Sequence, residues 1–142
     1  MNNQQYISQL RTTITRLVKK LRKESATGQY LSLTERSTMA LLYQHKALQP
    51  GDLATMEKIT NQSMSQILNH LLQLGYITRT TQQSDKRKVI IALTAEGERI
   101  LLRVRNEIDE WLSRAIEATC NEQEKELLKQ AIIPLAKIMD FE

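Results

Sequence analysis

One stretch of this chain has the pattern of β-strands, and helical patterns precede and follow it. Residues 76–81 and 89–93 are rich in β-branched and other strand-forming side chains, and seven polar residues separate them. This arrangement predicts a β-hairpin with a charged tip. Aromatic residues make up only 4% of the chain, and four Gly and two Pro are too few for a loop-rich all-β fold. The remainder is therefore expected to be helical.

Two amphipathic helices are expected at the start of the chain. Apolar residues recur every three or four positions from Ile7 to Leu21, which predicts a helix with a basic opposite face. Ser, Thr and Gly at 25–28 should end it. Thr34 is the expected N-cap of the second helix, because its hydroxyl can accept a hydrogen bond from a first-turn amide. The negative charge of Glu35 would then lie in the first turn, where it interacts favourably with the helix dipole.

A short third helix and an amphipathic fourth helix should follow. Pro50 suits the first position of the third helix, where a missing N–H does no harm. Its core face is expected to consist of Leu53, Ala54 and Met56. Thr60 should cap the fourth helix, and Gly75 should end it in the left-handed conformation.

Two long helices are expected after the hairpin. Thr94 should cap the first, whose apolar stripe from Ile100 to Ile116 exceeds what a single lobe could cover. Asn121 and Glu124 form a capping-box pattern for the last helix.

The predicted order is that of a mainly α protein with a small β-hairpin wing. From residue 34 to residue 93 it matches a winged helix-turn-helix, flanked by N- and C-terminal dimerisation helices. In such a fold the helix over 60–74 would enter a DNA major groove about 12 Å wide, and the hairpin would flank the next groove.

The charge distribution supports a polyanion partner. Residues 1–99 carry 14 Lys and Arg against 7 Asp and Glu, whereas residues 100–142 carry 6 against 9. A basic part joined to an acidic end indicates a nucleic-acid-binding lobe, although an excess of this size can also be ordinary solubilising charge.

The presumed recognition helix has an outer face of uncharged hydrogen-bonding side chains. Amides can pair with adenine, and hydroxyls can bond bases or phosphates. The alternative is a solvated helix face, where Lys and Glu would be commoner. The predicted DNA-binding residues of this helix are Thr60, Asn61, Gln62, Ser63, Ser65, Gln66 and Asn69.

The hairpin tip carries charges suited to DNA. Asp85 can pair with Arg87 and hold its guanidinium for insertion into a narrow minor groove. Arg79, Lys86 and Lys88 would contact phosphates. Taken alone, such a tip can also be solvated surface.

These residues closely resemble those of the MarR family, the multiple antibiotic resistance regulators, over nearly the whole chain. The wing signature D-x-R is Asp85-Lys86-Arg87. The other matching motifs are Leu33-Thr34, Leu53-Ala54, Thr60 to Leu74 closed by Gly75, Tyr76-Ile77 with Arg79, Leu93-Thr94 and Gly97. The resemblance implies a homodimeric regulator, usually a repressor, whose first, fifth and sixth helices interlock with those of its twin.

The resemblance also implies release from DNA by a small phenolic or anionic effector. By resemblance, the pocket candidates are Ile14, Met39, Tyr43, Ile108 and Trp111. Each is also a plausible core residue, and the residue types favour the core. Two departures stand out: Gln66 and Lys86 occupy positions where many members carry Arg. The peroxide-sensing branch has a reactive cysteine in the first helix, and this chain has none before Cys120.

The expected organisation is one domain over 1–142. A DNA-binding lobe would span 30–94, and a helical dimerisation region would combine 1–28 and 95–142. Apolar stripes on the terminal helices need a partner surface, which supports a homodimer independently. Two-fold symmetry suits a pseudo-palindromic operator with half-sites ~34 Å apart.

Other function classes find little support. Cys120 is the only cysteine, which excludes an intrachain disulfide, and with His45 and His70 it leaves too few ligands for a metal site. No cofactor motif or catalytic constellation occurs, so an enzyme is not expected. No segment has the length of a membrane span or the core of a signal peptide, so a cytoplasmic protein is expected. The remaining alternative is a winged-helix protein-interaction module that binds no specific operator.

Overall fold

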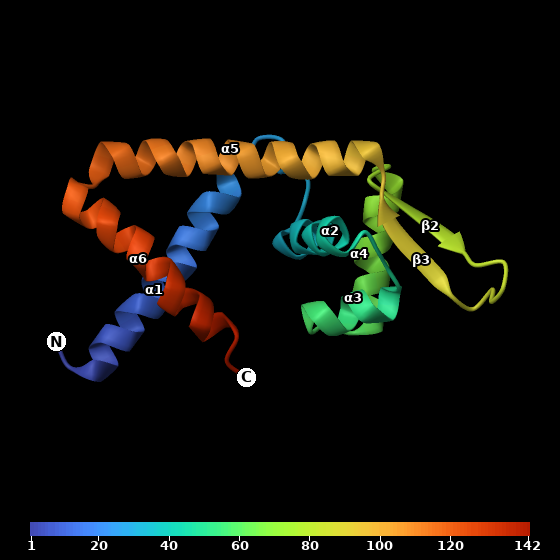
Figure 1. Cartoon of the computed structure of the whole chain (residues 1–142), viewed down its shortest axis with the longest axis horizontal. Helices are drawn as coiled ribbons and strands as arrows, with labels where there is room; N and C mark the ends of the chain where they lie inside the picture. Colours follow the sequence, from blue (N-terminus) through green and yellow to red (C-terminus); the bar gives the residue numbers. More distant parts are fainter. The chain divides into compact units, whose positions relative to one another are not determined.

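The computed structural model describes residues 1–142 as a mainly helical chain with a small antiparallel sheet (Figure 1). The elements are α1 (Asn3–Lys23), α2 (Leu33–His45), β1 (Ala47–Leu48), α3 (Pro50–Glu57), α4 (Asn61–Gln73), β2 (Ile77–Thr81), β3 (Val89–Leu93), α5 (Ala95–Thr119) and α6 (Glu122–Met139). The predicted fold class and element order are confirmed. Strand β1 was not predicted, because two residues are too few to produce an alternating pattern.

The chain divides into two compact units. The first spans Met1–Ile108 and contains the helix-turn-helix and the hairpin, and the second spans Asp109–Glu142. The division falls within α5.

The sheet has the order β1-β3-β2, with both pairs antiparallel. In the hairpin, Ile77 is opposite Leu93 and Thr81 is opposite Val89. The short strand β1 adds Leu48 opposite Ile91 on the other edge of β3. Strand β3 is therefore central, and its residue Ile91 is fully buried.

The core of the first unit joins α2, α3, α4 and the sheet. Its fully buried apolar side chains are Met39, Leu42, Leu53, Met64, Leu71 and Ile91. The expectation for Met56 was wrong, because it is 44% exposed. Leu53 and Ala54 fill the inner face of the short helix α3, and Ile59, beyond the helix end, packs against the core after them.

Capping explains where the helices begin. The N-cap of α2 is Ser32 rather than Thr34: the Ser32 hydroxyl accepts from Glu35 N at 3.0 Å, and the Glu35 carboxylate accepts from Ser32 N at 2.8 Å. This reciprocal capping box satisfies two amides, whereas Thr34 would satisfy one. The predicted caps of α4 and α6 are confirmed, and Gly75 has the expected positive φ of 78°.

The connection between α1 and α2 is tied to α5. Glu107 accepts hydrogen bonds from the Ser25 hydroxyl at 2.7 Å, the Thr27 hydroxyl at 2.8 Å and the Thr27 amide at 3.2 Å. These bonds, the one from Ser25 foremost, lower the pKa of Glu107 to about 2. The carboxylate thus stays charged and holds the connection against α5.

Candidate nucleic-acid interface

Helix α4 buries one face and presents the other to solvent. Met64, Leu68 and Leu71 are buried, so the helical period turns the polar positions outward. The predicted contact residues of α4 are all exposed: Asn61, Gln62, Ser63, Ser65, Gln66 and Asn69. The amides among them make no hydrogen bond within the chain, so they are free to bond another molecule.

The start of α4 is organised by hydroxyl groups. The Thr60 hydroxyl accepts from Ser63 N at 3.0 Å and donates to the Ser63 hydroxyl at 3.0 Å. Both predicted contact residues are therefore already used in capping, and the four amide side chains are the freer hydrogen-bonding groups of this surface.

The far end of α4 is held by a contact that the sequence did not predict. His70 Nδ1 contacts a carboxylate oxygen of Glu35, whose side chain is buried and also caps α2. The two residues are 35 positions apart, so no local pattern could reveal the pairing. The contact links the last turn of α4 to the first turn of α2.

The wing tip has the expected ion pair. Asp85 Oδ1 accepts from Arg87 N at 3.0 Å and from Arg87 Nε at 3.4 Å. The Arg87 side chain is 94% exposed, so the carboxylate orients it without covering it. Lys86 and Lys88 beside it, and Arg79 on β2, are also exposed. The wing therefore carries four solvent-exposed cations.

The base of the wing is joined to α4 and α5 by a tight backbone contact. The Tyr76 carbonyl accepts from Thr94 N at 3.0 Å, and the Thr94 hydroxyl donates to Gly75 O at 2.7 Å. The same hydroxyl accepts from Gly97 N at 3.0 Å, which confirms Thr94 as the cap of α5. Figure 1 shows α4 beside the base of the hairpin. The tip of the hairpin, residues 82–88, lies at the opposite end of the two strands.

The five predicted effector residues do not line one common cavity. Met39 is a fully buried core residue, Ile14 is exposed on α1, and Trp111 lies in the second unit. Tyr43 and Ile108 line two neighbouring cavities between α2 and α5. Both cavities are also lined by Ser37, Ala40 and Arg105, which the sequence did not indicate.

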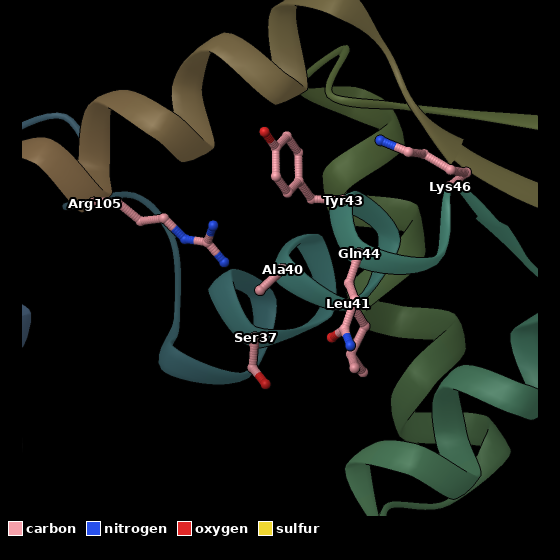
Figure 2. Close-up of a pocket in the computed structure, with 7 residues that line it drawn as sticks. All are labelled: Ser37, Ala40, Leu41, Tyr43, Gln44, Lys46 and Arg105. Atoms are coloured by element: carbon pink, nitrogen blue, oxygen red, sulfur yellow. The ribbon is translucent and has the colours of Figure 1, made fainter. Parts of the chain in front are cut away.

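The cavity that contains Tyr43 has a volume of about 530 Å³ (Figure 2). The Arg105 guanidinium lies 5.6 Å from the centre of the Tyr43 ring, and Lys46 Nζ lies 5.3 Å from it. Two cations thus share one aromatic ring, and no acidic residue lines the cavity.

No three His, Cys, Asp or Glu residues are grouped closely enough to hold a metal ion. None of the six helices has the length and apolar character required to cross a bilayer.

Comparison with known proteins places these features in context. Residues 31–89 match the family model described as the MarR family. The HTH-type transcriptional regulator FarR of Neisseria gonorrhoeae is 35% identical over 100 residues, which cover 70% of this chain and 68% of FarR.

Solved structures share the fold over nearly the full length. A crystal structure from Pseudomonas aeruginosa, assigned to the transcriptional regulators, superposes with a TM-score of 0.86 at 28% identity, covering 99% of this chain and 100% of the other. A point mutant of Staphylococcus aureus MepR, solved with a bound oligodeoxyribonucleotide, superposes with a TM-score of 0.67 at 22% identity, covering 94% and 98%.

Proposed function

Since this chain belongs to the MarR family of winged helix-turn-helix transcriptional regulators, we propose that it represses transcription by binding a pseudo-palindromic operator as a homodimer. Its relatives are regulators and not enzymes. The observation that carries the proposal is the free amide face of α4 beside a wing whose tip presents an oriented Arg87.

In this proposal the two elements have different tasks. Asn61, Gln62, Gln66 and Asn69 bond base edges in the major groove, while Thr60, Ser63 and Ser65 bond phosphates or bases. Arg87 enters the minor groove, held by Asp85. The three remaining cations, Arg79, Lys86 and Lys88, contact phosphates and set the position of the lobe on the duplex.

The homodimer is supported by apolar surface that one chain leaves exposed. On α1 the exposed residues include Ile7, Ile14, Leu17 and Val18. On α6 and the end of the chain they include Leu127, Leu128, Ile132, Ile133, Ile138, Met139 and Phe141. Each helix thus leaves many large apolar side chains exposed, which is typical of an interaction surface. We assign 30–94 to the DNA-binding lobe, and 1–28 with 95–142 to the dimerisation region.

The proposal predicts steeply salt-dependent binding to duplex DNA, because cations that neutralise phosphates release condensed counterions. Arg87→Ala should lower affinity on most sequences by roughly tenfold or more. Asn61→Ala or Gln62→Ala should instead cost about 1–3 kcal/mol on the preferred site and relax base preference locally. Fluorescence anisotropy on selected and scrambled duplexes would measure both effects.

Arg114→Ala is the matched control for Arg87→Ala, because it removes the same charge from an exposed position in the second unit. It should leave affinity nearly unchanged. Flat salt dependence of the unmodified protein would instead favour the alternative function, a winged-helix module that binds a protein partner. Equal losses on all duplexes from the α4 substitutions would contradict base reading.

We also propose that an apolar organic anion releases the protein from DNA. The second cavity, about 440 Å³, lies among α1, α2 and α5 and has mostly apolar walls. Its only charged lining residues are Arg22, Arg36 and Arg105.

Arg36 is the strongest support for an anionic ligand. Its side chain donates to Gly28 O at 2.6 Å and Arg22 O at 3.2 Å, yet its Nε has no hydrogen-bond partner. The residue is only 9% exposed, and desolvation, followed by the charge of Arg22, lowers the pKa of its guanidinium. A carboxylate in the cavity would compensate this buried charge, because guanidinium and carboxylate pair strongly.

The expected result is release of bound duplex by monocarboxylates such as benzoate or octanoate, and none by their uncharged amides at the same concentration. Arg105→Ala should raise the half-release concentration about tenfold, since it removes one charged contact from both cavities. Competition anisotropy on the preformed complex would measure it. Equal action of acid and amide would exclude charge recognition at this site.

A further inference from the structure

The turn between α3 and α4 contains a residue in an unfavourable backbone conformation. Lys58 has φ 58° and ψ 42°, the left-handed region. Lys58 N donates to Thr55 O at 3.2 Å, and Ile59 N donates to Ala54 O at 3.0 Å. This pattern ends α3 as a Schellman motif, whose left-handed position is usually glycine.

The Lys58 side chain makes no polar contact within the chain that would offset the energetic cost of this backbone conformation. A side chain with a Cβ is disfavoured in the left-handed region, where only Gly, and sometimes Asn, is common. Lys58 is exposed, and its ammonium makes no hydrogen bond, ion pair or ring contact within the chain. Lys46, the other non-glycine residue with positive φ, differs in this respect, because its ammonium lies over the Tyr43 ring.

The position of Lys58 relates it to the DNA-reading surface. It precedes the N-cap Thr60 by two residues, and the exposed amides of α4 begin at Asn61. If α4 enters the major groove as proposed, the flexible Lys58 side chain would place its ammonium next to the DNA backbone that flanks this groove. Lysine is well suited to such a contact, since phosphate needs a point charge and no particular fork geometry.

We propose that Lys58 is a phosphate-contacting residue of the protein–DNA complex, retained in a left-handed position for that contact. The inference rests on the proposed function, and it adds a fifth cation, on the helix-turn-helix itself, to the four at the wing. Each lysine that neutralises a phosphate should contribute about 0.9 to the slope of log affinity against log salt concentration. Two copies in a homodimer should contribute about 2.

The decisive variant is Lys58→Gly, because it removes the charge and relieves the backbone at once. The melting temperature should stay unchanged or rise by up to about 4 °C. The salt slope should become shallower by about 2, and affinity near physiological salt should fall about tenfold on every duplex. Lys58→Asn should give the same slope, and Lys58→Arg should keep the slope of the unmodified protein.

Lys46→Gly is the matched control, since it also removes one lysine and one strained φ. Its ammonium is engaged with Tyr43, so the salt slope should not change. An equal loss in Lys46→Gly would overturn the proposal by showing a general effect of net charge. An unchanged slope in Lys58→Gly, or a lower melting temperature, would also overturn it. The steep slope of the unmodified protein, measured alongside, would in those cases leave the regulatory function standing.

Discussion

Replacement of Gly97 by Ala is expected to destabilise the protein by about 3 kcal/mol or more. A Cβ at this position would lie 2.0 Å from the Tyr76 carbonyl oxygen and 2.8 Å from its carbonyl carbon. Both atoms belong to the backbone, so no side-chain rotation can relieve the clash. The Tyr76 carbonyl also accepts the amide of Thr94, so moving it disturbs the hydrogen bond that joins the hairpin to α5.

Urea unfolding monitored by circular dichroism would measure this loss as a lower midpoint at an unchanged slope. Gly51→Ala is the matched control. Gly51 lies in the first turn of α3, where a Cβ would meet no atom within 4 Å. The control should be neutral or stabilising by up to about 1 kcal/mol, because alanine reduces the entropy of the unfolded chain. Equal midpoints for the two variants would show that the close approach at Gly97 does not restrict the fold.

The second large effect is expected at the proposed dimer interface. Leu17→Glu places a charge in the apolar stripe of α1, where Leu17 is 46% exposed in the single chain. Two-fold symmetry brings the same surface patch of each chain into the interface, so the substitution adds two unpaired charges there. The homodimer should dissociate, and operator affinity should fall by about 100-fold or more, since the two lobes no longer bind as one molecule.

Sedimentation velocity and anisotropy on the same samples would test dissociation and loss of binding together. Thr12→Glu adds the same charge to the opposite, exposed face of α1 and should leave both properties unchanged. The fold of each lobe should survive in both variants, because no residue of α1 is buried in the core. A dimeric Leu17→Glu protein with normal affinity would place the interface elsewhere.

Local patterns in the sequence were sufficient for most elements. The apolar period located α4, and the Thr60 and Gly75 signals defined its ends to within a residue or two. The hairpin followed from its β-branched segments and the polar residues between them. Two details were wrong. Ser32 and Thr34 are both good N-cap residues, and Ser32 forms the reciprocal capping box of α2. Met56 lies on α3, whose eight residues are too few to define a buried face reliably.

The sequence alone determined the order of elements, the class of fold and the outward polar face of α4. These properties depend on the spacing of neighbouring residues, since helical and strand periods decide which side chains share a face. Only the tertiary structure revealed that His70 contacts Glu35, that Gly97 lies against the Tyr76 carbonyl, and that Arg22, Arg36 and Arg105 line one cavity. Such contacts join segments distant in the chain, and their geometry is set by the packing of the helices around the core rather than by any local pattern.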